Sequence, residues 1–223
     1  LSGARMEGAN LSGARMEGAD LSRARMEGAD LSRARMEGAD LSEARMEVAN
    51  LSRARMEGAN LRGARMEGAV LYEVRMEGAF LLEALFGHSL IWYTSMKSAL
   101  ISHVTFDGAG LMSADFSNSF YVEPVASRTT FLSAFGDGSV LLPEGVAAPA
   151  HWPEESLTKS AFLARWRGWR ESRGLPWPPP GRALSDEVFS GAVFGLGFGL
   201  FDLPSIPATP PNRPVDPSEI ADP

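Results

Sequence analysis

The sequence lacks cysteine, has little histidine and contains no long apolar run. Its 223 residues include no Cys and 3 His. The missing cysteines exclude disulfides, thiolate metal sites and cysteine nucleophiles. The nearest approach to a long apolar run, residues 188–203, contains four glycines and falls short of the ~20 apolar residues that a membrane-spanning helix requires.

An excess of basic residues is also absent. The chain carries 21 Lys and Arg against 28 Asp and Glu, which gives a net charge of −7. This balance argues against direct nucleic-acid binding through a basic surface, and it weakly favours an acidic surface that meets a basic partner. The hydrophobic fraction of 44% permits a sizeable core in one or two domains. The chain begins with LSGAR, without Met or a charged leader, so we expect its native N-terminus to be missing.

A six-residue motif recurs every ten residues through the first part of the chain. ARMEGA stands at residues 4–9, 14–19, 24–29, 34–39, 54–59 and 64–69, with ARMEVA at 44–49 and VRMEGA at 74–79. Each ten-residue unit splits into two halves of five, and each half has one large apolar residue, the anchor, two places after a small residue. The anchors of the regular repeats are Met6, Leu11, Met16, Leu21, Met26, Leu31, Met36, Leu41, Met46, Leu51, Met56, Leu61, Met66, Leu71, Met76 and Leu81.

A period of five fits neither a helix nor a straight strand. On a helix, anchors five apart step around the axis by about 140°, and no apolar stripe forms. On a strand, an odd spacing sends successive anchors to opposite faces. The chain must therefore turn after every anchor, with the anchors pointing inward and most other positions facing water. Such regular internal repetition is typical of a solenoid.

The halves that contain Leu or Phe share one pattern. ANLSG at 9–13, ADLSR at 19–23 and 29–33, and ADFSN at 114–118 each read Ala, Asp or Asn, Leu or Phe, then two variable polar residues. In this pattern the chain resembles the pentapeptide-repeat family. The ARMEG halves depart from it, with Arg for Asp or Asn and Met for Leu or Phe. The resemblance implies an all-β solenoid, a right-handed quadrilateral β-helix with twenty residues in each coil.

The pattern keeps its phase to Phe116, and the composition then changes. The C-terminal third contains a predicted amphipathic helix with Pro153 near its start and Gly174 at its end. We expect a β-helix at residues 1–120 and its irregular end at residues 121–150. An amphipathic capping α-helix follows at residues 151–174, and a Pro/Gly-rich disordered tail at residues 175–223.

A ten-residue unit in a twenty-residue coil predicts columns of like side chains along the rod. Two Arg columns are expected on opposite sides: Arg5, Arg25, Arg45 and Arg65, and Arg15, Arg35, Arg55 and Arg75. A Glu column runs beside each of them, so the ladders mainly neutralise one another, at about 0–1 kcal/mol for each exposed pair. The other two sides carry Asn and Asp, which can hydrogen-bond the backbone in turns.

No catalytic, metal-binding or cofactor-binding residue is predicted. His88 and His103 have no nearby carboxylates, and His151 is distant from both in sequence. Every acidic pair in the repeats has identical siblings, so none has the unusual environment that shifts a catalytic pKa. GLGFG at 195–199 lacks the Lys and the Ser or Thr of a phosphate-binding loop. We therefore expect neither an enzyme nor a bound cofactor.

Three functions stay open, and the preferred one is a non-enzymatic scaffold or protein-interaction module whose partner is unknown. The resemblance implies a second, because some pentapeptide-repeat proteins imitate duplex DNA and bind type II topoisomerases; here, however, the Arg columns cancel most of the acid. The third is peripheral membrane association through the basic, Trp-containing helix. Candidate interaction residues of that helix are Arg165, Trp166, Arg167, Trp169 and Arg170. We expect a cytoplasmic protein, with membrane association and oligomeric state left open.

Overall fold

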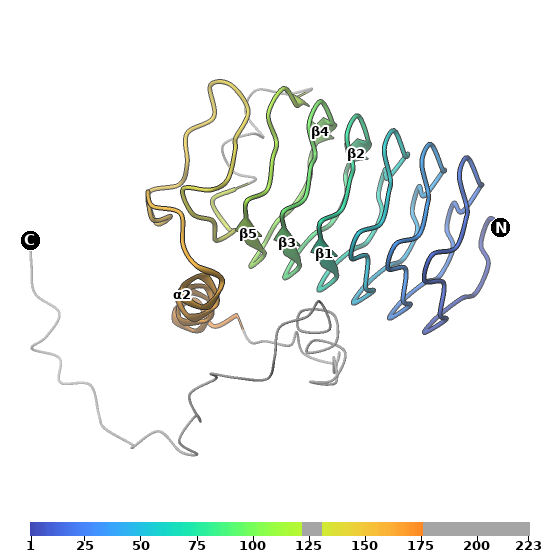
Figure 1. Ribbon diagram of the computed structural model, residues 1–223, viewed down its shortest axis with the longest axis horizontal. Helices are drawn as coiled ribbons and strands as arrows, with labels where there is room; N and C mark the ends of the chain where they lie inside the picture. Colours follow the sequence, from blue (N-terminus) through green and yellow to red (C-terminus); the bar gives the residue numbers. More distant parts are fainter. Residues whose placement is uncertain (122–130, 176–223) are drawn as a thin grey trace, which may run out of the picture.

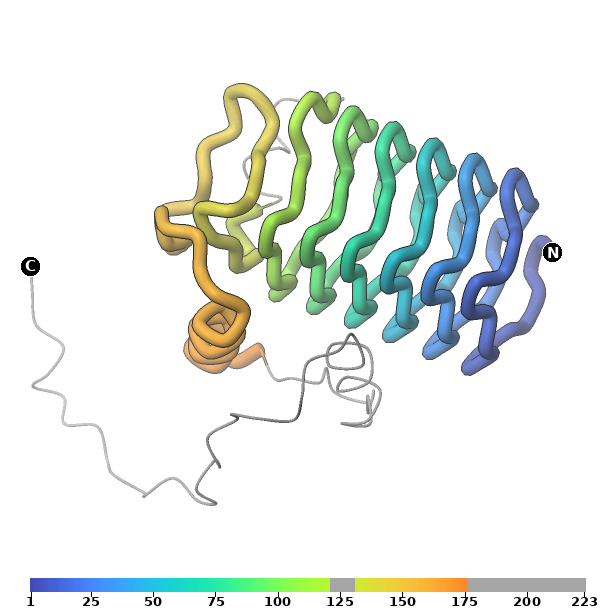
Figure 2. The backbone as a smooth tube through the Cα atoms, in the orientation of Figure 1, coloured from blue at the N-terminus to red at the C-terminus, as the bar shows by residue number. Residues whose placement is uncertain are grey.

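The chain winds into a rod of stacked coils (Figure 1). This computed structural model describes residues 1–121 and 131–175. Parallel bridges join residues twenty apart, such as Arg5 and Arg25, so each coil takes twenty residues. The tube in Figure 2 shows these coils as a regular stack that leads from the N-terminus to the helix.

Backbone hydrogen bonds hold each coil to the next. The N–H of Met6 donates to the carbonyl of Arg25 at 2.7 Å, and the N–H of Arg25 donates back to the carbonyl of Ala4 at 2.8 Å. The same exchange repeats along the rod because every coil presents the same residue types at the same places. Since buried backbone groups must be paired, this ladder fixes the register at twenty residues.

Two three-stranded parallel sheets form in the later coils, on opposite sides of the rod (Figure 1). The first contains β1 (Val70–Tyr72), β3 (Leu90–Trp92) and β5 (Gly110–Met112); the second contains β2 (Phe80–Leu82), β4 (Leu100–Ser102) and β6 (Phe120–Tyr121). In the earlier coils Asn or Asp holds a turn at this place: Oδ1 of Asn10 accepts from the N–H of Ser12 at 3.1 Å. Val70 and Phe80 cannot make this bond, and the backbone extends there instead.

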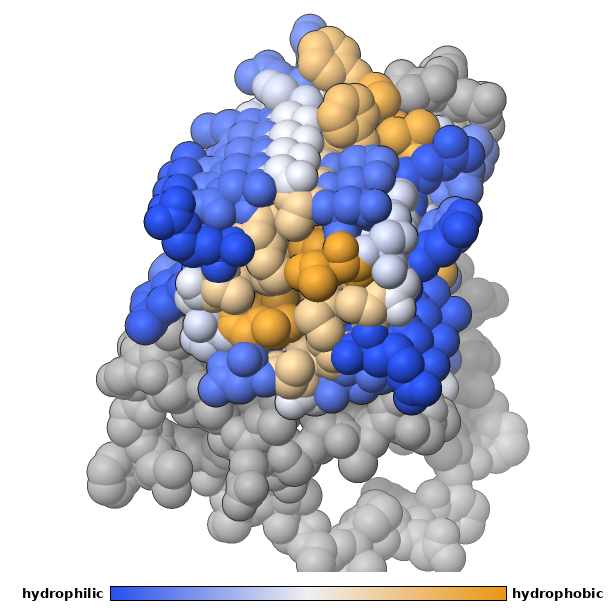
Figure 3. All heavy atoms as spheres, turned by 90° about the vertical axis from the view of Figure 1, so that its right-hand side faces the viewer, coloured by the Kyte–Doolittle hydropathy of each residue, from blue (hydrophilic) through white to orange (hydrophobic). Residues whose placement is uncertain are grey.

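The apolar core fills the rod. The anchors from Met16 to Leu81 are buried in it. Met6 and Leu11 are only partly buried because they lie in the first coil, at the end of the stack. Figure 3 looks at this end and shows apolar side chains at its centre with hydrophilic ones around them.

Aromatic rings close the opposite end of the core. Phe131 and Trp152 belong to the same buried cluster as the anchors, and their ring centroids are 6.2 Å apart. Phe131 also lies 5.1 Å from Phe116, the last regular anchor. A bridge from Asp115 to Leu141 carries the parallel pairing beyond residue 121.

The helix α2 (Lys159–Ser172) begins later than the sequence pattern predicts. Pro153 lies before it, because the side chain of Thr158 caps the helix by accepting from the N–H of Ala161. After its C-terminal end, Gly174 has the left-handed backbone, with a φ of 65°. In the part of the chain that the structure describes, no helix has the length and apolar character needed to span a membrane.

The helix lies against the side of the rod, where Phe162 and Trp166 join a buried cluster with Leu90 and Met112. The expected cap at the end of the core is therefore formed by the aromatic rings described above, and α2 covers the first sheet instead. Over its described residues, the chain is a β-helix-type solenoid of parallel strands with one C-terminal helix. The expectation of a disordered tail falls on residues 176–223, which lie outside the described residues, as do residues 122–130.

Candidate interaction surfaces

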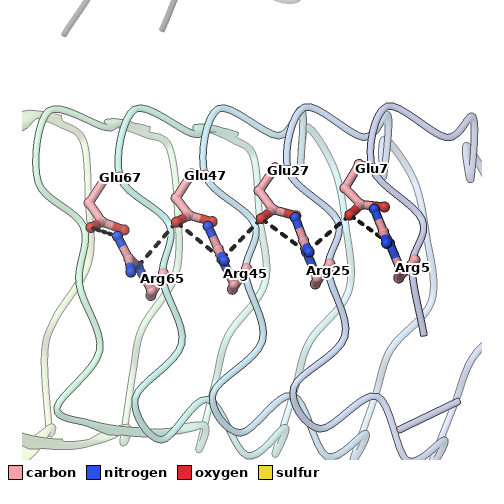
Figure 4. Close-up of polar contacts among 8 residues, drawn as sticks. All are labelled: Arg5, Glu7, Arg25, Glu27, Arg45, Glu47, Arg65 and Glu67. Carbon is pink, nitrogen blue, oxygen red and sulfur yellow. Dashed lines mark hydrogen bonds and ion pairs between the residues drawn. The ribbon is translucent and has the colours of Figure 1, made fainter. Parts of the chain in front are cut away.

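Alternating Arg and Glu side chains form a charge ladder along one side of the rod (Figure 4). The Nε of Arg25 lies 3.0 Å from Glu7 of the preceding coil and 3.7 Å from Glu27 of its own coil. The contact repeats between Arg45 and Glu27 at 3.0 Å. The predicted stacking of Arg over Arg is confirmed by the parallel bridges, and each Arg column is bridged by Glu.

A second ladder runs along the opposite Arg column, where Arg35 contacts Glu17 at 3.0 Å and Glu37 at 3.6 Å. The pKa of Glu17 lies below its ordinary value because the carboxylate accepts a backbone hydrogen bond and faces Arg35 and Arg15. Solvent screens each pair at this partly exposed surface, so a single pair adds little to stability. Because every Arg has a Glu beside it, neither side presents a continuous basic or acidic surface.

One carboxylate in the first ladder is fully buried. The Glu47 side chain is 0% exposed and lies 3.1 Å from the Nε of Arg65 and 3.7 Å from that of Arg45. The next residue, Val48, stands where the other ARMEG copies have Gly and keeps the left-handed backbone with a φ of 53°. This copy therefore departs from the regular repeat in both burial and backbone strain.

The Asn and Asp columns serve the turns. Oδ1 of Asp20 accepts from the N–H of Ser22 at 3.0 Å and from its hydroxyl at 2.6 Å. These bonds lower the pKa of Asp20. Neighbouring coils also share hydrogen bonds, such as that from Asn60 to Asp40 at 3.1 Å. The carboxylates of these two sides thus accept hydrogen bonds from the backbone and from neighbouring Ser and Asn side chains.

Both of these columns become apolar in the later coils. In the first, Asn50 pairs with Val70, and Leu90 and Gly110 follow. In the second, Asn60 pairs with Phe80, and Leu100 and Phe120 follow. We call the three residues Phe80, Leu100 and Phe120 the apolar column. The sequence carries this signal, since the Asn/Asp place of the repeat holds apolar residues there, but the repeat analysis did not single these residues out.

The helix α2 covers the first of these columns and leaves the apolar column exposed. Phe162 and Trp166 pack so closely that a Cβ on Gly110 would lie 3.2 Å from the Trp166 ring. Phe80 and Phe120, by contrast, are 46% and 64% exposed.

Two of the five candidate residues of α2 are engaged in this packing. Trp166 is 0% exposed, and its Nε1 donates to the carbonyl of Gly108 at 3.2 Å. Arg170 is 1% exposed and donates to the same carbonyl at 2.7 Å and to Nδ1 of His88 at 3.1 Å. These side chains hold the helix on the rod and are not available at its surface.

The other three candidates lie nearer to solvent. Arg165 is exposed and pairs with Glu155 at 2.8 Å, and Arg167 is partly buried. Trp169 is partly buried and stacks on His151 with ring centroids 5.4 Å apart. The outer surface of α2 therefore carries basic side chains without a fully exposed Trp.

The contact between α2 and the rod brings together two basic groups. Burial, followed by the charge of Arg170, lowers the pKa of His88. Burial lowers the pKa of Arg170 to about 10. The other two histidines have separate neighbours: His103 contacts the hydroxyl of Ser102, and His151 contacts the carbonyl of Ala134. Among the described residues, no three His, Asp or Glu side chains are grouped so as to hold a metal ion.

These features define a repetitive β-solenoid whose Arg and Glu side chains form ion pairs along the rod. A family profile described as pentapeptide repeats matches residues 1–42 and 49–87 in 8 copies. This match is confined to the regular repeats, and it agrees with the resemblance to pentapeptide repeats seen in the sequence. A search of curated proteins found no match.

Several solved structures resemble the chain. A pentapeptide repeat protein from the thylakoid lumen of Arabidopsis thaliana is 21% identical, with 60% of this chain and 79% of that one covered and a TM-score of 0.38. HetL, involved in heterocyst differentiation regulation in the cyanobacterium Nostoc, is 19% identical, with 70% and 88% covered and a TM-score of 0.36. QnrB1, a plasmid-mediated fluoroquinolone resistance protein, is 17% identical, with 75% and 90% covered and a TM-score of 0.33.

Proposed function

We propose that this protein is a non-enzymatic interaction scaffold whose partner is another protein. The observation that carries the proposal is the change from Asn60 to Phe80 in one column of the rod, which leaves Phe80 and Phe120 largely exposed. Large exposed apolar side chains are costly in water and are typical of surfaces that bind other molecules.

The rod suits this role because its own side chains stabilise a rigid shape. We propose the finer form of a right-handed, four-sided β-helix. It is supported by the four turns in each twenty-residue coil, which follow anchors such as Met6, Leu11, Met16 and Leu21. A rigid rod loses little conformational entropy when it binds, so even a small contact surface can be used.

The same observations favour a scaffold over the two alternatives. A rod that imitates DNA needs a strongly negative side, whereas each Glu of the ladders faces an Arg, as Glu7 faces Arg25. Membrane association through α2 would need its Trp side chains at the surface, whereas Trp166 packs on Gly110. A protein partner that binds the later coils requires neither a strongly negative side nor exposed Trp side chains.

Affinity capture with the intact chain as bait tests the proposal. The lysate comes from the organism that encodes the chain, and an unrelated β-solenoid of similar size is the control bait. We expect at least one protein to be retained by the intact chain and not by the control. Retention of nothing beyond the control set would overturn the proposal, as would turnover of a substrate by the purified chain.

A further inference from the structure

The apolar column marks one side of the rod in the later coils. Its members are in direct register, since Phe80 pairs with Leu100 and Leu100 pairs with Phe120. Earlier in the same column stand Asp40 and Asn60, so the change in polarity is confined to these coils. Figure 3 shows apolar side chains gathered at its top, the side on which Figure 1 places β2 and β4.

The rod itself shows what covers such a column. On the opposite side, Leu90 and Gly110 occupy the equivalent places and are covered by α2. The contact is made by Phe162 and Trp166, which are four residues apart and so lie on one face of the helix. Phe162 also meets the ring of Trp92 at 5.9 Å. One helix with two large apolar side chains is thus sufficient to bury a column of this kind.

The size of the exposed surface decides between a helix and a second copy of the chain. With ~200 Å² for each aromatic side chain, the exposed parts of Phe80 (46%) and Phe120 (64%) amount to about 220 Å². A stable dimer needs about 800 Å² on each partner, so self-association through this column alone would be too weak. A single helix that inserts two side chains matches the available area, and a contact of this size is a weak, transient one.

We propose that the apolar column is the docking surface for an amphipathic α-helix of a partner protein. This inference rests on the proposed function and names the kind of partner. The helix presents two large apolar side chains four residues apart, as α2 does with Phe162 and Trp166. They pack between Phe80 and Phe120 over Leu100, in the arrangement that α2 adopts across the first sheet.

The test uses the intact chain and a synthetic peptide of α2, residues 157–175, carrying a fluorescent label. The variant Phe80→Asn/Leu100→Asn/Phe120→Asn restores the residue type that Asn60 has in this column. Leu141→Asn is the matched control, because Leu141 is 54% exposed and lies in another column. We expect saturable binding to the wild type and to the Leu141→Asn variant in fluorescence anisotropy, and at least tenfold weaker binding to the triple variant.

Hydrogen exchange locates the bound peptide. Protection of β2, β4 and β6 supports the proposal, and a peptide with Phe162→Ala and Trp166→Ala should not bind. The proposal is overturned by absent binding, by equal binding to the triple variant, or by protection of β1, β3 and β5 instead. Self-association of the wild type that the triple variant loses would also overturn it, because a second copy would then occupy the column.

Two further results keep the outcome clear. Circular dichroism must show that the triple variant folds; if it does not, Phe80→Asn alone replaces it, because Asn60 precedes this residue in the column. If the peptide fails while the intact chain still retains a cellular protein, this inference falls and the proposed function stands. If both experiments fail, both conclusions fall.

Discussion

Acidification should weaken the attachment of α2 to the rod through His88. This residue projects from a coil, and its Nδ1 accepts a hydrogen bond from Arg170 at 3.1 Å. Protonation would remove the acceptor and place two cations in contact. Of the other charged groups at this place, Asp107 raises the pKa of His88, and Glu67 lies beside the adjacent Gly87. The pKa of His88 is nevertheless lowered, because the effects of burial and of the Arg170 charge outweigh that of these carboxylates.

The direction of the pH effect follows from this lowered pKa. Below about pH 6.5, the ordinary value for His, the unfolded chain binds a proton that the folded chain resists. The contribution of His88 to the free energy of unfolding is therefore fully present above about pH 6.5 and is lost as the pH falls below that value. Two unit charges ~4 Å apart interact by about 4 kcal/mol at an effective dielectric constant of ~20. Because His88 is only partly buried, we expect a loss of about 1–2 kcal/mol.

Thermal unfolding between pH 8 and pH 5, followed by Trp fluorescence, measures this effect. Trp166 reports on α2 because it is buried against the rod. His88→Gln should flatten the pH dependence. His103→Gln is the matched control, since His103 has the same place in the repeat and a similar φ of 52° but contacts Ser102 rather than Arg170. A His88→Gln variant that kept the wild-type pH dependence would refute the reasoning.

Four other variants, three substitutions and one deletion, test the packing. Val48→Gly should raise the free energy of unfolding by about 1 kcal/mol in urea titrations, because it relieves left-handed strain at a small entropic cost; a lower stability would contradict this. Gly108→Ala should cost about 2–4 kcal/mol and loosen α2, since its φ is 68° and the added Cβ would lie 2.6 Å from His88. Gly58→Ala, with a φ of 66° and open space around it, should lower the free energy of unfolding by only about 1 kcal/mol. Equal losses of stability in the Gly108→Ala and Gly58→Ala variants would disprove the close contact of Gly108 with His88. Deletion of residues 21–40 should leave a shorter folded rod by circular dichroism and sedimentation, and unfolding would refute the twenty-residue register.

The sequence predicts the rod because its information is local and repeated. A small residue two places before each anchor, from Ala4 and Met6 onward, requires a turn every five residues. The stacking of Arg5 on Arg25 follows only with the twenty-residue coil that the resemblance to pentapeptide repeats implies. The attachment of α2 could not be predicted in this way. The contact between Arg170 and His88 joins residues that no period relates. Thr158 fixes the start of α2 through one capping bond, which competed with the equally plausible signal from Pro153.

Regular repeats make a poor binding site because no place on them differs from its neighbours. Arg25 and Arg45 have the same contacts to Glu at the same distance, so a partner would find no preferred position between them. Specific recognition requires a break in the pattern, and on the side that α2 leaves uncovered the Asn/Asp column is broken at Phe80. If this reasoning holds, deletion of residues 21–40 should leave the affinity for the α2 peptide unchanged, because that deletion removes only positions with equivalents elsewhere. A loss of affinity would show instead that the earlier coils contribute directly to binding, and that the length of the rod matters for recognition.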